Sequence, residues 1–136
     1  MIMVDNKIRT YSELIKLETF KERFDYLYLH GNVGENTFGY DRYLNQIFYM
    51  SKEWKDIRRY IILRDHGCDL GISDREIHNQ KILIHHLNPL DKDDILYRSE
   101  YLINPEYLIC TTKLTHDKIH YGIDETFASE YVERTK

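Results

Sequence analysis

The chain has 136 residues, of which 42% are hydrophobic and 31% are charged, and its formal net charge is -4. This length suits one compact domain, and the negative charge excludes a protein held on DNA by bulk electrostatic attraction. No apolar run approaches the roughly 20 residues that span a bilayer, and residues 1–10 show no signal-peptide pattern. We therefore expect a cytoplasmic protein without a membrane partner. Cys68 and Cys110 belong to no CxxC pair, which predicts two reduced thiols.

The first half of the chain predicts helices. Apolar residues recur every three or four positions from Thr10 to Leu29, and Thr10 with Glu13 matches a capping box. Glycines and asparagines indicate a loop from about His30 to Gly39, and a short helix is expected from Tyr40 to Met50. Residues 1–50 thus form an N-terminal helical region, which is a candidate docking surface for a partner protein.

A second amphipathic helix is expected after Ser51, which can cap it, up to about Asp65. It is the most basic part of the chain, with Lys52, Lys55, Arg58, Arg59 and Arg64. Such a helix usually presents a solvated face. The alternative is contact with phosphate, for which Arg58 and Arg59 are the candidates.

The second half predicts a strand, a connection, a strand and a helix. The expected strands are Lys81–His86 and Tyr107–Thr112, and a polar connection at Asp91–Ile103 lies between them. A helix from Thr112 to Gly122 and a closing helix at Asp124–Arg134 follow. The fold class is therefore α+β, with N-terminal helices followed by a ββα unit within residues 51–136.

Four of the seven histidines lie in this ββα unit. His116 and His120 are four residues apart, so a helix places both rings on one face. Two imidazoles so placed can hold one divalent cation, and His85 at the end of the first strand can supply a third ligand. Three protein ligands leave positions open for water and a phosphate oxygen, as catalytic metal sites require.

His86 has a separate candidate role. Side chains of neighbouring residues on a strand point to opposite faces, so His85 and His86 do not share one metal without a bend. An imidazole whose pKa is near 6.5 can take a proton from water near neutral pH. A bend near Asn88 would bring His86 alongside the metal as a general base.

At these residues the sequence resembles the HNH, or ββα-metal, endonuclease superfamily, over about Trp54 to Tyr121. The stretch IHHLNP resembles its first-strand motif, and CTTKLTHDKIH resembles its second strand and metal helix. The double histidine followed by HxxxH is similar to the colicin-type DNases, and RDHGCDLG is similar to short HNH proteins of bacteriophages. The resemblance implies a phage or prophage source, and then a location in the host cytoplasm.

The resemblance also implies site residues. By position, His85, His116 and His120 would bind one divalent metal ion, of which Zn, Mg, Mn and Ni are candidates, and His86 would be the general base. The family's middle asparagine has no direct counterpart, because Tyr107 takes its position, and Asn104 is the nearest candidate. The paired cysteines of a structural zinc knuckle are absent.

The family's phosphate-binding arginine before the double histidine is also missing, because Asn79 falls near its position. Lys81 and Lys118 are candidate phosphate contacts. The sequence therefore predicts an endonuclease that hydrolyses DNA. The alternative is an inactive, metal-stabilised module of a phage that binds nucleic acid or protein.

Overall fold

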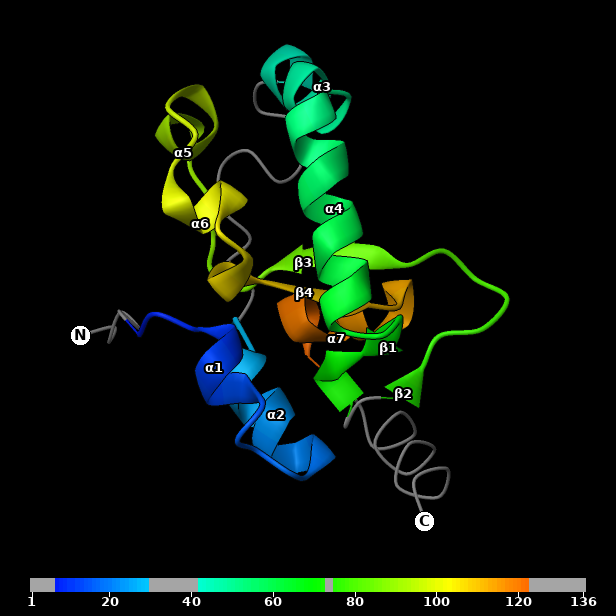
Figure 1. Ribbon diagram of the computed structural model, residues 1–136. Coiled ribbons are helices and arrows are strands. Elements are labelled where there is room, and N and C mark those ends of the chain that lie inside the picture. The colour runs from blue at the N-terminus through cyan, green and yellow to red at the C-terminus, as the bar shows by residue number, and fades with distance from the viewer. Residues whose placement is uncertain (1–6, 30–41, 73–74, 123–136) are drawn as a thin grey trace, which may run out of the picture.

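The computed structural model describes residues 7–29, 42–72 and 75–122 (Figure 1). Helices and two small antiparallel sheets make up this part of the chain, so the α+β class is confirmed. The expected loop His30–Gly39 and the expected closing helix Asp124–Arg134 lie outside the described residues.

A β-hairpin-like pair and a helix form the centre of the molecule. β3 (Leu83–His86) pairs antiparallel with β4 (Leu108–Thr111), with His85 opposite Ile109. α7 (Lys113–Tyr121) follows β4 directly. Its expected cap is confirmed, because the side chain of Thr112 accepts a hydrogen bond from the backbone N–H of Thr115. The helix stops at Gly122, whose φ of 99° is a conformation that glycine adopts easily.

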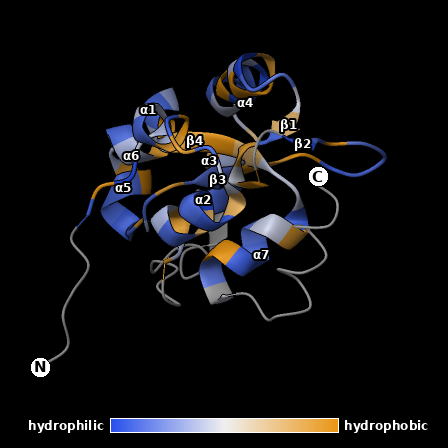
Figure 2. Cartoon of the chain, turned by 90° about the horizontal axis from the view of Figure 1, so that it is seen from below, coloured by the Kyte–Doolittle hydropathy of each residue, from blue (hydrophilic) through white to orange (hydrophobic). Residues whose placement is uncertain are grey.

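The two faces of the β3–β4 sheet are covered by different elements, with α4 (Lys52–Arg64) on one side and α7 on the other (Figures 1 and 2). On β4, the side chains of Leu108 and Cys110 belong to a hydrophobic cluster that also contains buried residues of α4. Ile109 packs with Ile119 of α7 in a second cluster. Successive side chains alternate across a strand, so residues 108–110, which face the two clusters in turn, are all apolar, and β4 is coloured mainly as hydrophobic in Figure 2.

The expected single helix from Thr10 to Leu29 is wrong. Two helices, α1 (Tyr11–Leu14) and α2 (Phe20–Leu27), are separated by residues 15–19. The break occurs because Thr19 and Glu22 form a complete capping box, which starts a new helix. Both helices pack on the α7 side of the sheet: Leu14 and Leu27 are fully buried there, and the Leu29 N–H donates to the Ile119 carbonyl at 3.1 Å. Their apolar face is thus covered by the chain itself.

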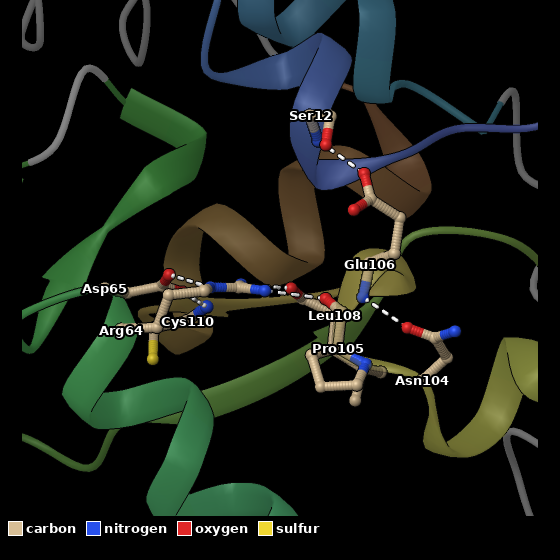
Figure 3. Close-up of polar contacts among 8 residues, drawn as sticks. All are labelled: Ser12, Arg64, Asp65, Asn104, Pro105, Glu106, Leu108 and Cys110. Carbon is tan, nitrogen blue, oxygen red and sulfur yellow. Dashed lines mark hydrogen bonds and ion pairs between the residues drawn. The ribbon is translucent and has the colours of Figure 1, made fainter.

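The expected helices before the sheet are confirmed as α3 (Arg42–Tyr49) and α4. The end of α4 is bound to the segment that leads into β4 (Figure 3). Arg64 donates to the Pro105 and Leu108 carbonyls and pairs with Asp65 at 2.7 Å. Asp65, which is 4% exposed, accepts the Cys110 N–H at 2.9 Å. These bonds hold α4 against the face of the sheet on which Leu108 and Cys110 lie.

The expected polar connection between β3 and β4 contains regular structure. It holds α5 (Lys92–Leu96), α6 (Glu100–Ile103) and the 3-10 helix η2 (Pro105–Tyr107). A second small sheet, which the sequence did not predict, joins β1 (Cys68–Asp69) to β2 (Arg75–Glu76), with the 3-10 helix η1 (Leu70–Ile72) after β1.

Candidate metal centre

Three histidines from β3 and α7 meet on one face of the sheet. The ring centroid of His85 lies 5.2 Å from that of His116 and 5.1 Å from that of His120, and the two α7 rings are 4.5 Å apart. One ligand nitrogen from each ring lies within 4.8 Å of the others. Nitrogens around a tetrahedral metal, at bonds of 2.0–2.1 Å, are about 3.4 Å apart, so small ring rotations would bring all three to bonding distance.

His85 itself supports the fit to a metal ion. Its side chain is 0% exposed, and within the described part of the chain neither ring nitrogen has a hydrogen-bond partner. A buried polar atom without a partner costs about 1–3 kcal/mol. A metal bond to one nitrogen would remove part of that cost, and the imidazole is a common ligand of divalent transition metals.

Burial lowers the pKa of all three rings and so favours their neutral form. It lowers the pKa of His85 well below 6.5, with smaller contributions from the charges of the neighbouring histidines and Arg9. Burial also lowers the pKa of His120 to about 4. It lowers the pKa of His116 too, against an opposing effect of Asp117. Neutral imidazoles keep the lone pair that a metal needs, so protons compete weakly for this site near pH 7.

His116 forms the open side of the group, because its side chain is 25% exposed while His120 is 5% exposed. Its Nδ1 lies 3.6 Å from a carboxylate oxygen of Asp117. That carboxylate is in turn held by Lys113 at 2.7 Å. A carboxylate beside one nitrogen fixes the ring and leaves the other nitrogen for a metal.

A buried carboxylate fixes the start of α7. Asp69 is 0% exposed, and its two oxygens accept the backbone N–H groups of Thr112 at 3.0 Å and Gly71 at 2.9 Å. Burial raises its pKa, while hydrogen bonds from Thr115 and Thr112 oppose the rise. Sequence reasoning missed Asp69, because only the fold brings it to the start of α7.

His86 lies apart from the three-histidine group, on the opposite face of β3. Its ring stacks on Trp54 of α4 at 5.6 Å, with an interplanar angle of 17°. Its Nε2 lies 3.3 Å from the Leu102 carbonyl oxygen. Because a carbonyl only accepts, this hydrogen bond requires the proton on Nε2 and leaves the lone pair on Nδ1. Burial lowers the pKa of His86 to about 4.

The other predicted site residues have varied surroundings. Asn104 ends α6, and its Oδ1 accepts the Glu106 N–H at 2.9 Å, which fixes the turn before β4 (Figure 3). Arg58 donates to the Ile82 carbonyl at 2.8 Å and is half-buried. Arg59 and Lys81 are exposed, and Lys118 is half-buried.

Asn88, expected to end the bend after the double histidine, binds the N-terminal segment instead. It exchanges hydrogen bonds of 2.8 and 3.0 Å with the backbone of Arg9.

No family model, curated protein or solved structure matches this chain. Among the residues that the structure describes, no helix is both long and apolar enough to cross a membrane. Both cysteines are free, as the sequence predicts.

Proposed function

We propose that this protein is a metal-dependent endonuclease of the HNH type, which hydrolyses phosphodiester bonds of DNA. The observation that carries the proposal is the group of His85, His116 and His120, whose ligand atoms lie within 4.8 Å of one another. The order strand, strand, helix around it supports the same reading. A bound divalent metal would polarise the scissile phosphate and offset charge on the leaving oxygen.

The chain's own residues have these roles in the proposal. His85, His116 and His120 bind the metal, and the partial exposure of His116 leaves an approach for the phosphate. His86 is the proposed general base, with its lone pair on Nδ1 because the Leu102 carbonyl holds the proton on Nε2. Its ring packs on Trp54 across the sheet from the three histidines, so this role requires the ring to move from Trp54 to the metal side of β3. A bond forms between the water oxygen and phosphorus, and the bond from phosphorus to the leaving oxygen breaks. Arg59 and Lys81, both exposed, are the proposed phosphate contacts outside the metal site.

Plasmid nicking tests this proposal, with Mg²⁺, Mn²⁺, Ni²⁺ or Zn²⁺ added to metal-stripped protein. We expect His86→Ala to lower the nicking rate by about 10²–10⁴-fold and to leave metal affinity unchanged. His116→Ala and His120→Ala should weaken both. His78→Ala is the matched control, because the His78 side chain is 68% exposed and is not one of the three candidate ligands. A wild-type protein that binds metal but nicks no plasmid with any of the four ions would refute the proposal.

A metal-stabilised binding module is the second candidate. The placement of the His86 ring favours it, because that ring packs on Trp54 across the sheet from the three histidines. This candidate predicts that metal raises the melting temperature without any turnover. Plasmid nicking by the wild type that is lost in His86→Ala would rule out this second candidate.

A further inference from the structure

Thr111 is the second buried polar side chain without a partner beside the three histidines. It is 0% exposed, and within the described residues its hydroxyl has no hydrogen-bond partner. Threonine hydroxyls at buried positions normally donate or accept a hydrogen bond. An unpartnered hydroxyl at the centre of a sheet therefore needs a reason.

The strand register places Thr111 on the same face as His85. Leu83 pairs with Thr111 and His85 pairs with Ile109, so Thr111 and His85 are diagonal neighbours across the two strands. Ile109, two residues before Thr111, packs in the cluster of α7, and the alternation of side chains gives Thr111 the same direction. Diagonal neighbours on one face are within reach of long side chains.

The chemistry of a metal-bound histidine connects the two side chains. When one nitrogen binds a metal, the other carries a proton and almost always donates it to an oxygen atom. His116 has the carboxylate of Asp117 beside its Nδ1. For His85, neither nitrogen has a partner in the described chain. A hydroxyl oxygen can accept such a proton, and the Thr111 hydroxyl is a buried oxygen on the same sheet face as His85 with no partner among the described residues.

We propose that Thr111 is a positioning residue of the metal centre, whose hydroxyl accepts the N–H of metal-bound His85 and fixes its ring. This inference rests on the metal site of the proposed function but not on nuclease activity. It also gives Thr111 opposite effects in two states. The hydroxyl costs stability in the metal-free protein, where it is a buried polar group without a partner, and it strengthens metal binding in the metal-bound protein.

The test compares Thr111→Val, which keeps the shape and removes the hydroxyl, with Thr111→Ser, which keeps the hydroxyl. Zn²⁺ and Co²⁺ affinities are measured by chelator competition, and the melting temperature is measured in EDTA. We expect Thr111→Val to lower metal affinity about 10–100-fold, with a melting temperature in EDTA equal to or above that of wild type. Thr111→Ser should keep the wild-type affinity.

A matched control separates this role from packing. Ile109→Val removes one methyl group from the same strand face, so it should lower the melting temperature in EDTA and leave metal affinity unchanged. In the Zn²⁺-loaded wild type, the ring N–H of His85 should give a slowly exchanging NMR signal that Thr111→Val loses.

Wild-type metal affinity in Thr111→Val would overturn the inference. A wild-type protein that binds none of Zn²⁺, Co²⁺, Mg²⁺, Mn²⁺ and Ni²⁺ would overturn both this inference and the proposed function. A protein that binds metal without nicking would overturn the function alone, and the affinities of the variants would still decide the role of Thr111.

Discussion

Adjacent residues of the same type have different surroundings in this protein. His85 points to α7 and is completely buried, whereas His86 points to α4 and stacks on Trp54. The cause is the alternation of side chains on β3. In the proposed function this strand end supplies a metal ligand, His85, and a base, His86, whose ring has to leave Trp54 to reach the metal side.

Arg58 and Arg59 form a second adjacent pair with unlike surroundings, and they give a test of DNA contact. Arg58 is half-buried and donates to the Ile82 carbonyl at 2.8 Å. Arg59 is exposed. We expect Arg59→Ala to weaken DNA binding and to reduce the slope of log affinity against log salt by about 1, because one phosphate contact is lost.

The control for this prediction is Arg58→Ala. Loss of its hydrogen bond should lower the free energy of unfolding by about 1–3 kcal/mol, as urea titration would measure. Arg59→Ala should change that free energy by less than about 0.5 kcal/mol. Equal salt slopes for wild type and Arg59→Ala would remove Arg59 from the proposed DNA surface.

At the scale of elements, α7 is fixed by contacts with η1. Asp69 accepts the N–H groups of Thr112 and Gly71, so the start of α7 and the turn after β1 share one carboxylate. Gly71 lies so close to α7 that a Cβ atom there would be 2.6 Å from Cγ2 of Thr115. The helix that carries His116 and His120 therefore has little freedom to move toward η1.

Gly71→Ala should destabilise the protein by about 1–3 kcal/mol, because the new methyl group overlaps with Thr115. Thr115→Ser removes the methyl group of Thr115, and alone it should cost about 0.8 kcal/mol. The double variant should be more stable than the sum of the single effects predicts, by about 1–3 kcal/mol. Urea unfolding of the four proteins measures this coupling. Additive effects would contradict the close approach of the two elements.

Local signals predicted the elements that carry the site. Thr112 and Gly122 delimit α7, and the apolar residues of β3 and β4 identify the two strands, so their existence followed from short stretches of sequence. The break between α1 and α2 was missed because the apolar spacing continues through it. The capping box of Asp91 and Asp94, which starts α5, lies in the stretch that was interpreted as a polar connection.

The whole molecule supplies what local sequence could not. The HxxxH spacing and the double histidine predicted the group of His85, His116 and His120. The roles of Asp69 and Thr111 depend instead on strand register and burial, which arise only when distant segments pack. The N-terminal helices complete the burial of the α7 side, with Leu14 and Leu27 in the same cluster as Ile119.

Burial of several neutral histidines makes the stability of the whole molecule depend on pH. The folded pKa values of His86 and His120 are about 4, below the ordinary 6.5, because of burial. Above pH 6.5 these rings are neutral in both states. Between pH 6.5 and 4 the unfolded chain binds more protons than the folded one, so the stability of metal-free protein should fall as pH falls through this window.

The size of this effect is up to about 1.4 kcal/mol per pH unit for each ring, measured by urea unfolding in EDTA. His86→Gln removes one of these rings, so its stability should fall less steeply between pH 6.5 and 4 than that of wild type. His78→Gln, at an exposed position, should keep the wild-type slope. Constant stability in EDTA over this range would contradict the prediction, and so would a wild-type slope in His86→Gln. Either result would mean that the folded protein binds protons on these rings as readily as the unfolded chain does.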